Sequence, residues 1–199
     1  MPETSQTQPN DAGRQNLKKG TLAALVGVAS AIGLFTLTPR EESGRKVSVS
    51  VAEDGTATIQ HISGPQYLTA YLDVVKVPTI CDGLTGRDIK PGMRFTPAQC
   101  TARLEDALVL HAKGVMDCTP GLKVGMYRRD NVRIAMVSLA YNVGVAGYCR
   151  SSIPGKINTG HIHEACDALL SFNRAGGRVI AGLTARRERE RAICMKDAA

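Results

Sequence analysis

The 199-residue sequence contains no tryptophan, and aromatic residues make up only 4% of it. A hydrophobic core must therefore be built from Leu, Val, Ile, Ala and Met, which the overall hydrophobic content of 43% permits. The sequence also lacks a helix-turn-helix signature, a ribonucleoprotein aromatic motif and zinc-finger spacing, so it predicts no nucleic-acid partner. Its length suits one domain of ordinary size with an appendage, rather than two large domains.

Metal-binding and phosphate-binding motifs are missing as well. No Cys-x-x-Cys pair occurs among the six cysteines, and none of the four histidines is spaced with a Glu as a metal site would require. The segment RSSIPGKIN at 150–158 lacks the first glycine of a phosphate-binding loop. We therefore predict no metal and no cofactor. The cysteines are either buried thiols or three disulfides, depending on the redox compartment.

The net charge of +7 is the clearest signal in the composition. A positive excess suits an anionic partner such as nucleic acid, a membrane surface or an acidic cell-wall polymer. A basic soluble protein with no polyanionic partner is the plain alternative.

No charged residue occurs between Lys19 and Arg40. The stretch Gly20 to Pro39 has the ~20 residues that a helix needs to cross a bilayer, although Gly, Ala, Ser and Thr make up more than half of it. We predict a marginal membrane anchor, with a cleaved signal peptide as the alternative. The positive residues before this stretch place the N-terminus in the cytoplasm and export the rest. In a bacterium the cysteines would then lie in an oxidising space, which favours disulfides.

The sequence divides into four segments. Residues 1–19 are polar and are predicted to form a disordered tail. Residues 20–39 are the predicted anchor, residues 40–60 a β-hairpin linker, and residues 61–199 the main domain. The hairpin is predicted from KVSVSVAEDGTATIQ, in which apolar and polar residues alternate on both sides of Asp54-Gly55.

The main domain is predicted to be α+β and mainly α. Helical spacing of apolar residues and helix start and stop signals carry this prediction. The expected elements are a short helix at 64–70, a small sheet at 71–95, a long helix starting at Thr96-Pro97, a helix from Asp130 to Gly144, and helices at 161–173 and 184–195 separated by Gly176-Gly177.

Asp73 and Thr79 lie in AYLDVVKVPTICDGLTG, which resembles the active-site hairpin of phage-type lysozymes, glycoside hydrolase family 24. The resemblance continues through SLAYNVG and GYCRSSIPGKINTGHIHEACDALLSFNRAGGRVIAGLTARRERERAIC. It covers residues 62–196. It implies a lysozyme-like domain that acts on peptidoglycan and cleaves the β-1,4 bond between N-acetylmuramic acid and N-acetylglucosamine, for host lysis or wall remodelling.

The family's catalytic set is Glu, eight residues, Asp, five residues, Thr. The resemblance therefore implies Asp73 and Thr79 as catalytic residues, but the expected acid position holds Gly64. General acid catalysis is worth ~10²- to 10⁴-fold, so an active enzyme needs a substitute. The candidate substitutes are Asp82, Glu53 and Asp54. Strand alternation puts Asp82 on the face opposite Thr79, which weakens that candidate.

The resemblance also implies a glycan cleft, a disulfide pattern and a releasable anchor. The cleft would be lined by Tyr141, Asn142 and Gly144. The expected disulfides are Cys81–Cys100, Cys118–Cys149 and Cys166–Cys194. The segment Gly20 to Pro39 resembles the signal-anchor-release segment of some endolysins, so a monomer would be held in the inner membrane with its catalytic domain in the periplasm, and could later be released.

A catalytically inactive, peptidoglycan-binding or regulatory homologue is the second hypothesis. The Gly64-Pro65 pair favours it, whereas the intact spacing of Asp73 and Thr79 favours the enzyme.

Overall fold

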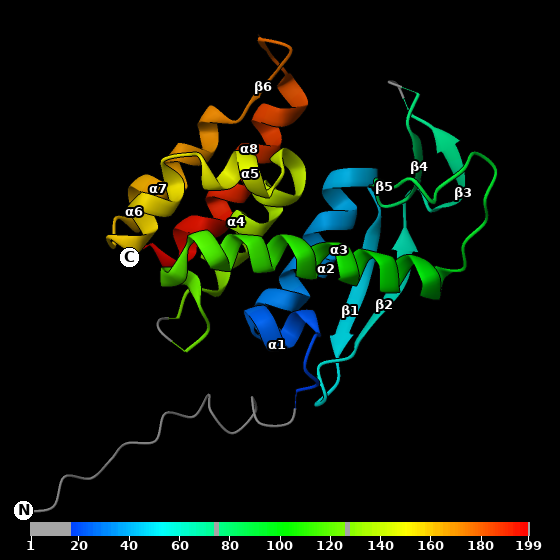
Figure 1. Ribbon diagram of the computed structural model, residues 1–199, viewed down its shortest axis with the longest axis horizontal. Helices are drawn as coiled ribbons and strands as arrows, with labels where there is room; N and C mark the ends of the chain where they lie inside the picture. The colour runs from blue at the N-terminus through cyan, green and yellow to red at the C-terminus, as the bar shows by residue number, and fades with distance from the viewer. Residues whose placement is uncertain (1–16, 74–75, 126–127, 199) are drawn as a thin grey trace, which may run out of the picture.

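The computed structural model describes residues 17–73, 76–125 and 128–198, which form a mainly helical α+β fold with small antiparallel sheets (Figure 1). The strands are β1 (Lys46–Val51), β2 (Ala57–Ser63), β3 (Tyr67–Leu72), β4 (Pro78–Cys81), β5 (Leu84–Thr85), β6 (Arg174–Ala175) and β7 (Arg178–Val179). The helices are α1 (Leu22–Val26), α2 (Val28–Ser43), α3 (Pro97–Cys118), α4 (Asp130–Val143), α5 (Val145–Cys149), α6 (Ile153–Asn158), α7 (Ile162–Ala168) and α8 (Ala181–Cys194). Short 3₁₀ turns occupy Pro120–Leu122, Leu169–Ser171 and Met195–Asp197.

The uncharged N-terminal segment forms part of the core. Gly27 has a φ of 88° and separates α1 from α2. The two helices pack against α3 and α4, and their buried side chains include Leu22, Val26, Leu34 and Phe35. Among the described residues, no helix has both the length and the apolar character that crossing a bilayer would require.

The hairpin predicted before the main domain is present, and its second strand runs on to Ser63. β1 and β2 pair antiparallel from Lys46↔Ser63 to Val51↔Ala57, and the turn contains Asp54 and Gly55. The tip of the hairpin lies against the start of α1, where the Lys18 backbone N–H donates to the Asp54 carbonyl at 2.8 Å. Most of the tail predicted at 1–19 lies outside the described residues, but Leu17 packs against the core and Lys18 pairs with Asp54.

The helix predicted at 64–70 is wrong, because β3 occupies Tyr67–Leu72. The side chains of β3 alternate with a period of two, as a strand requires. Ala70 is buried in a small core with Ile80 and Cys100, whereas Tyr67 and Tyr71 are exposed on the other face. β4 lies between β3 and β5 in this sheet.

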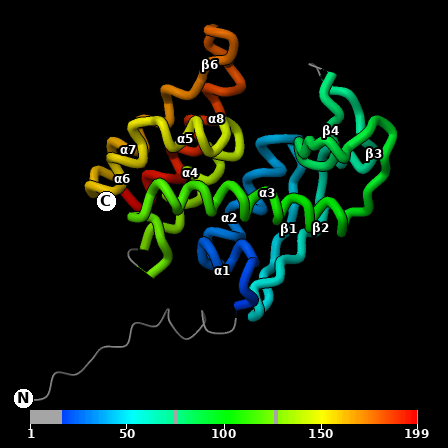
Figure 2. Tube along the Cα trace, viewed as in Figure 1, coloured from blue at the N-terminus to red at the C-terminus, as the bar shows by residue number. Residues whose placement is uncertain are grey.

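The long helix α3 starts as the sequence predicts. Thr96 and Gln99 form a reciprocal capping box, in which each side chain accepts a backbone N–H bond from the other residue. The apolar face of α3 is buried, and the helix crosses from the β3–β5 sheet to the C-terminal helices (Figure 2).

The other predicted helices are present with different ends. Asp130 is the first residue of α4 and does not cap it, because its Oδ1 accepts bonds from Ser30 (2.8 Å) and Arg133 (2.9 Å). The helix predicted at 161–173 is α7 followed by a 3₁₀ turn, and α8 begins three residues earlier than predicted. Gly176 and Gly177 form the turn between β6 and β7.

Three disulfides tie these elements together. They join Cys81 to Cys100, Cys118 to Cys149 and Cys166 to Cys194, the same pairs that the resemblance implied. The first links the β3–β5 sheet to α3, and the third links α7 to α8.

Candidate functional site

Glu42 lies in the last turn of α2. The C-terminal end of this helix lies near β5 (Figure 1). Its Oε1 accepts a 2.7 Å bond from Nη1 of Arg186, and its side chain is 19% exposed. Gly83, in the turn between β4 and β5, leaves room for it, because a Cβ there would lie 3.2 Å from Oε2 of Glu42. The carboxylate is therefore partly open to solvent and held between α8 and the β4–β5 turn.

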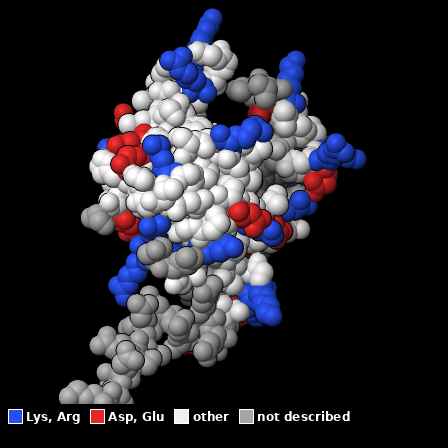
Figure 3. All heavy atoms as spheres, turned by 60° about the vertical axis from the view of Figure 1, so that its left-hand side comes forward, with Lys and Arg blue, Asp and Glu red and all other residues white. Residues whose placement is uncertain are grey.

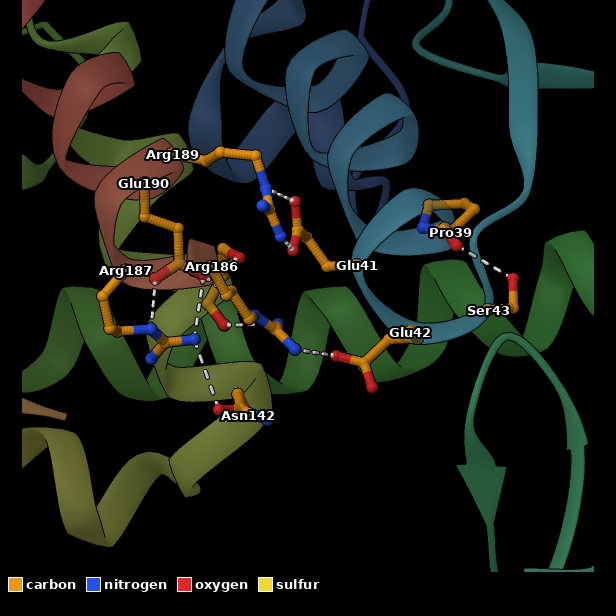
Figure 4. A network of polar contacts seen from close by, with 10 residues as sticks. Pro39, Glu41, Glu42, Ser43, Asn142, Arg186, Arg187, Arg189 and Glu190 are labelled. Atoms are coloured by element: carbon orange, nitrogen blue, oxygen red, sulfur yellow. Dashed lines mark hydrogen bonds and ion pairs between the residues drawn. The ribbon is translucent and has the colours of Figure 1, made fainter. Parts of the chain in front are cut away.

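Arg186, which donates this bond to Glu42, is buried. Its Nε donates to Oε1 of Glu190 at 3.1 Å (Figure 4). Its Nη2 donates to the Ser138 carbonyl at 3.3 Å. Burial lowers the pKa of Arg186, but the negative charges of Glu42 and Glu190 outweigh burial and raise it overall. Arg186 is therefore protonated, and its bonds to Glu190 and Ser138 do not depend on Glu42.

Glu41, the neighbouring residue, is held differently. Its two carboxylate oxygens accept bonds from Nε (2.8 Å) and Nη2 (2.6 Å) of Arg189, and its side chain is only 2% exposed. The two adjacent glutamates thus point to two different arginines of α8 (Figure 4). Glu41 is closed off in a bidentate pair, whereas Glu42 keeps exposed surface.

Asp73 and Thr79 lie on either side of the turn between β3 and β4. Thr79 pairs with Tyr71, so their side chains share a face, and Asp73 comes two residues after Tyr71. Oδ1 of Asp73 accepts a 2.8 Å bond from the Val77 backbone N–H, which fixes the turn. The Thr79 hydroxyl donates to the Val77 carbonyl at 3.0 Å. The two predicted catalytic residues therefore lie near the same turn, and Thr79 is buried, with 4% of its surface exposed.

The position predicted to hold the family's acid has no room for a side chain. A Cβ on Gly64 would lie 2.6 Å from the Gly44 carbonyl oxygen, and the φ of Gly64 is 89°. The backbone that directly follows Glu42 therefore lies against the position at which the Glu was expected.

The candidate substitute acids are not placed for this role. Asp82 is 1% exposed, and both its carboxylate oxygens accept bonds from Arg45. Glu53 and Asp54 lie at the tip of the β1–β2 hairpin, against the start of α1 and away from the end of α2. A hydrogen bond from Lys18 lowers the pKa of Asp54 to about 2, which is the wrong direction for a proton donor.

The residues expected to line the cleft lie at the end of α4. Burial, followed by the charges of Glu42 and Asp82, raises the pKa of Tyr141. The Asn142 residue is exposed, and its Oδ1 accepts a 3.2 Å bond from Nη2 of Arg187. Gly144, with a φ of 79°, ends the helix.

Positive side chains are spread over the surface with acidic ones between them, rather than gathered into one patch on the visible face (Figure 3). The charge excess therefore does not mark the site by itself.

The model of the phage lysozyme family matches residues 64–190. The chain belongs to the phage lysozyme family. This confirms the family that the hairpin and C-terminal motifs indicated. The match begins at Gly64, so Glu42 lies outside it.

Whole-chain relatives and solved structures agree with this family. The chain is 36% identical to a "SAR-endolysin" of Enterobacteria phage P21, over 90% of the chain and 96% of that protein. It is 35% identical to a "SAR-endolysin" of Bacteriophage PS119, over 90% and 94%. The active form of P1 phage endolysin Lyz matches with a TM-score of 0.58 and 26% identity, over 65% of this chain and 76% of that one.

Sequence reasoning missed Glu42 because it counted back from Asp73 with a fixed spacing. One signal was available in PREESGRK, where two glutamates and a glycine end an apolar helix directly before the hairpin.

Proposed function

We propose that this phage lysozyme family member is an endolysin-type muramidase, with Glu42 as the proton donor. It cleaves the β-1,4 bond between N-acetylmuramic acid and N-acetylglucosamine in peptidoglycan. One observation carries the proposal: Glu42 contacts the β4–β5 turn and the buried Arg186, and it is partly exposed. A general acid needs this combination of fixed position and access to substrate.

The chemistry divides between two carboxylates. Glu42 would protonate the leaving glycosidic oxygen. Asp73 would orient water or stabilise the oxocarbenium-like transition state, and the Thr79 hydroxyl would assist. Arg186 would keep Glu42 in place through the catalytic cycle, because Glu190 and Ser138 hold the guanidinium independently of Glu42.

The inactive-homologue hypothesis rested on Gly64. With Glu42 as the acid, the chain has a complete set of Glu, Asp and Thr, and Gly64 becomes the residue that lets the hairpin strand pass the end of α2. The enzyme is therefore the function that the geometry favours.

Residues 20–39 would serve first as a releasable anchor in the inner membrane, with the N-terminus in the cytoplasm and the lysozyme domain in the periplasm. The absence of charge between Lys19 and Arg40 supports this, and so does the small-residue composition. The same residues supply buried core side chains of α1 and α2 in the folded domain. Because α2 also carries Glu42, the anchored form would lack a positioned acid and would be inactive until release.

The function is tested with the purified full chain on permeabilised Gram-negative cells and on isolated peptidoglycan. We expect loss of turbidity and products with a reducing N-acetylmuramic acid end. Glu42→Gln and Asp73→Asn should each abolish this activity while the circular dichroism spectrum is kept. Unchanged product formation by folded Glu42→Gln would refute Glu42 as the acid, and no product from the parent chain would favour the inactive homologue.

The anchor is tested separately by fractionation of cells that express the chain. We expect the chain in the membrane fraction before the membrane is de-energised and in the periplasm afterwards. A chain that is periplasmic from the start, or shortened at its N-terminus, would instead indicate the cleaved signal peptide.

A further inference from the structure

Glu42 lies beside Gly83 of the sheet that also carries Thr79, without the short covalent connection to Asp73 that the family spacing implies. Residues 43–72 lie between Glu42 and Asp73, and they include the whole β1–β2 hairpin. A connection of this length does not by itself fix one carboxylate relative to the other. Contacts outside the covalent path must set their relative position.

Asp82 supplies such a contact. It lies in the β4–β5 turn, directly before the Gly83 that Glu42 touches. Nε of Arg45 donates to Oδ1 of Asp82 at 2.9 Å, and Nη2 of Arg45 donates to Oδ2. The two side chains are 5% and 2% exposed, so water screens this ion pair little.

Ser43 adds a second link to the same carboxylate. Its hydroxyl lies 2.9 Å from Oδ1 of Asp82 and 2.8 Å from the Pro39 carbonyl, and its single proton serves one of these acceptors at a time. Ser43 and Arg45 stand on either side of Gly44, which ends α2 in the left-handed region with a φ of 73°. Asp82 is therefore bound by both side chains next to the helix end that carries Glu42.

The turn that carries Asp82 is itself fixed to the rest of the domain. Cys81, the preceding residue, is bonded to Cys100 of α3 and has a φ of 55°. The turn is thus held by a covalent bond on one side and by a buried, bidentate ion pair on the other. Planar guanidinium–carboxylate pairs of this kind fix orientation as well as distance.

We propose that the buried pair of Arg45 and Asp82 is the positioning device that holds Glu42 beside the β4–β5 turn of the sheet that carries Asp73 and Thr79. Arg45 and Asp82 are positioning residues, since they act through Glu42. This inference rests on the proposed role of Glu42. A misplacement of about 1 Å is enough to cost ~10²-fold in rate, so the pair should act on turnover more than on substrate binding.

The test measures kcat and KM on soluble peptidoglycan fragments, at a temperature where circular dichroism shows each variant folded. Asp82→Asn should lower kcat by about 10- to 100-fold and change KM by less than about threefold. Arg45→Lys keeps the charge without the fork and should give an intermediate kcat. The control is Asp88→Asn, which removes the exposed Asp88–Arg103 pair and should leave both constants unchanged.

A double variant separates positioning from stability. Arg45→Met with Asp82→Leu replaces the ion pair by apolar side chains, a change that often preserves stability. We expect a melting temperature near that of the parent and a kcat that stays low. This variant also carries the test if Asp82→Asn does not fold.

The outcomes distinguish the two proposals. A parental kcat in folded Asp82→Asn, or a kcat restored in the double variant, overturns the positioning role while an inactive Glu42→Gln keeps Glu42 as the acid. An active Glu42→Gln overturns the acid, and the positioning role with it.

Discussion

Glu41 and Glu42 are adjacent in sequence, and they should respond to the same substitution in opposite ways. Glu42→Gln removes the proposed proton donor, so kcat should fall by ~10²- to 10⁴-fold, which is ~2.7 to 5.4 kcal/mol of barrier. Its effect on stability is limited because glutamine can still accept a bond from Arg186, although the pair is mostly buried. Arg186 also keeps Glu190.

Glu41→Gln should instead affect the fold. The Glu41 side chain is 2% exposed and accepts two bonds from Arg189, which is itself 41% exposed and can regain water when the pair is lost. A hydrogen bond to a charged group is worth ~1.5 to 3 kcal/mol. For a chain of this size we expect the melting temperature to fall by roughly 3 to 12 °C, with kcat within roughly threefold of the parent, under ~0.7 kcal/mol of barrier.

Thermal denaturation by circular dichroism and reducing-end release from peptidoglycan measure the two effects on the same preparations. The reasoning fails if Glu41→Gln loses activity as severely as Glu42→Gln while still folded. It also fails if Glu42→Gln has the lower melting temperature of the two, because the exposure and contacts of each carboxylate would then not determine the loss of stability.

Three further predictions follow from the core. Replacing Cys166 and Cys194 by alanine opens a loop with a sequence separation of 28 and should cost ~3 to 4 kcal/mol in urea denaturation by the loop-entropy model; no loss would show that α8 docks without it. Burial raises the pKa of Tyr148, and burial with the charges of Glu42 and Asp82 raises the pKa of Tyr141. Because the folded state favours the neutral phenols, the free energy of unfolding should decline as the pH rises above ~10. Absorbance at 295 nm should show these two rings un-ionised until the protein unfolds. A chain that begins at residue 40 lacks buried Leu22, Val26, Leu34 and Phe35 and should not fold, which near-ultraviolet circular dichroism and proteolysis would reveal; a cooperative unfolding transition in that chain would contradict the placement of α1 and α2 in the core.

Sequence signals predicted the structure correctly where the interacting residues lie close together in the chain. The capping box of Thr96 and Gln99 marks the start of α3 because both partners lie within one turn. The turn at Asp54 and Gly55 marks the β1–β2 hairpin for the same reason. The helix expected at 64–70 failed because Tyr67, Leu68 and Ala70 alternate between solvent and a small core that includes Ile80 and Cys100, which come later in the chain.

The N-terminal segment shows a different limit. Its lack of charge from Gly20 to Pro39 suits a bilayer and a protein core equally well, because both exclude water. The sequence therefore predicts apolar surroundings for this segment, but it does not distinguish a bilayer from a protein core. The packing of α2 against α3 and α4, with Leu34 and Phe35 buried in the shared core, decides the matter for the folded domain, and these helices come more than fifty positions later in the chain.

Sequence spacing failed to locate an acid for a related physical reason, because residues far apart in the chain lie close together in space. Counting eight residues back from Asp73 assumes that distance along the chain measures distance in space. The β1–β2 hairpin begins after Gly44 and ends before Gly64, and the backbones of these two glycines lie against each other. Position 64 therefore lies against the backbone that comes two residues after Glu42. Glu42 lies beside Gly83 and Arg186, although it does not have the family's sequence spacing from Asp73. A hairpin whose ends meet can separate two residues in sequence with little effect on their separation in space, and under the proposal the Arg45–Asp82 pair supplies the orientation that a short connection would impose.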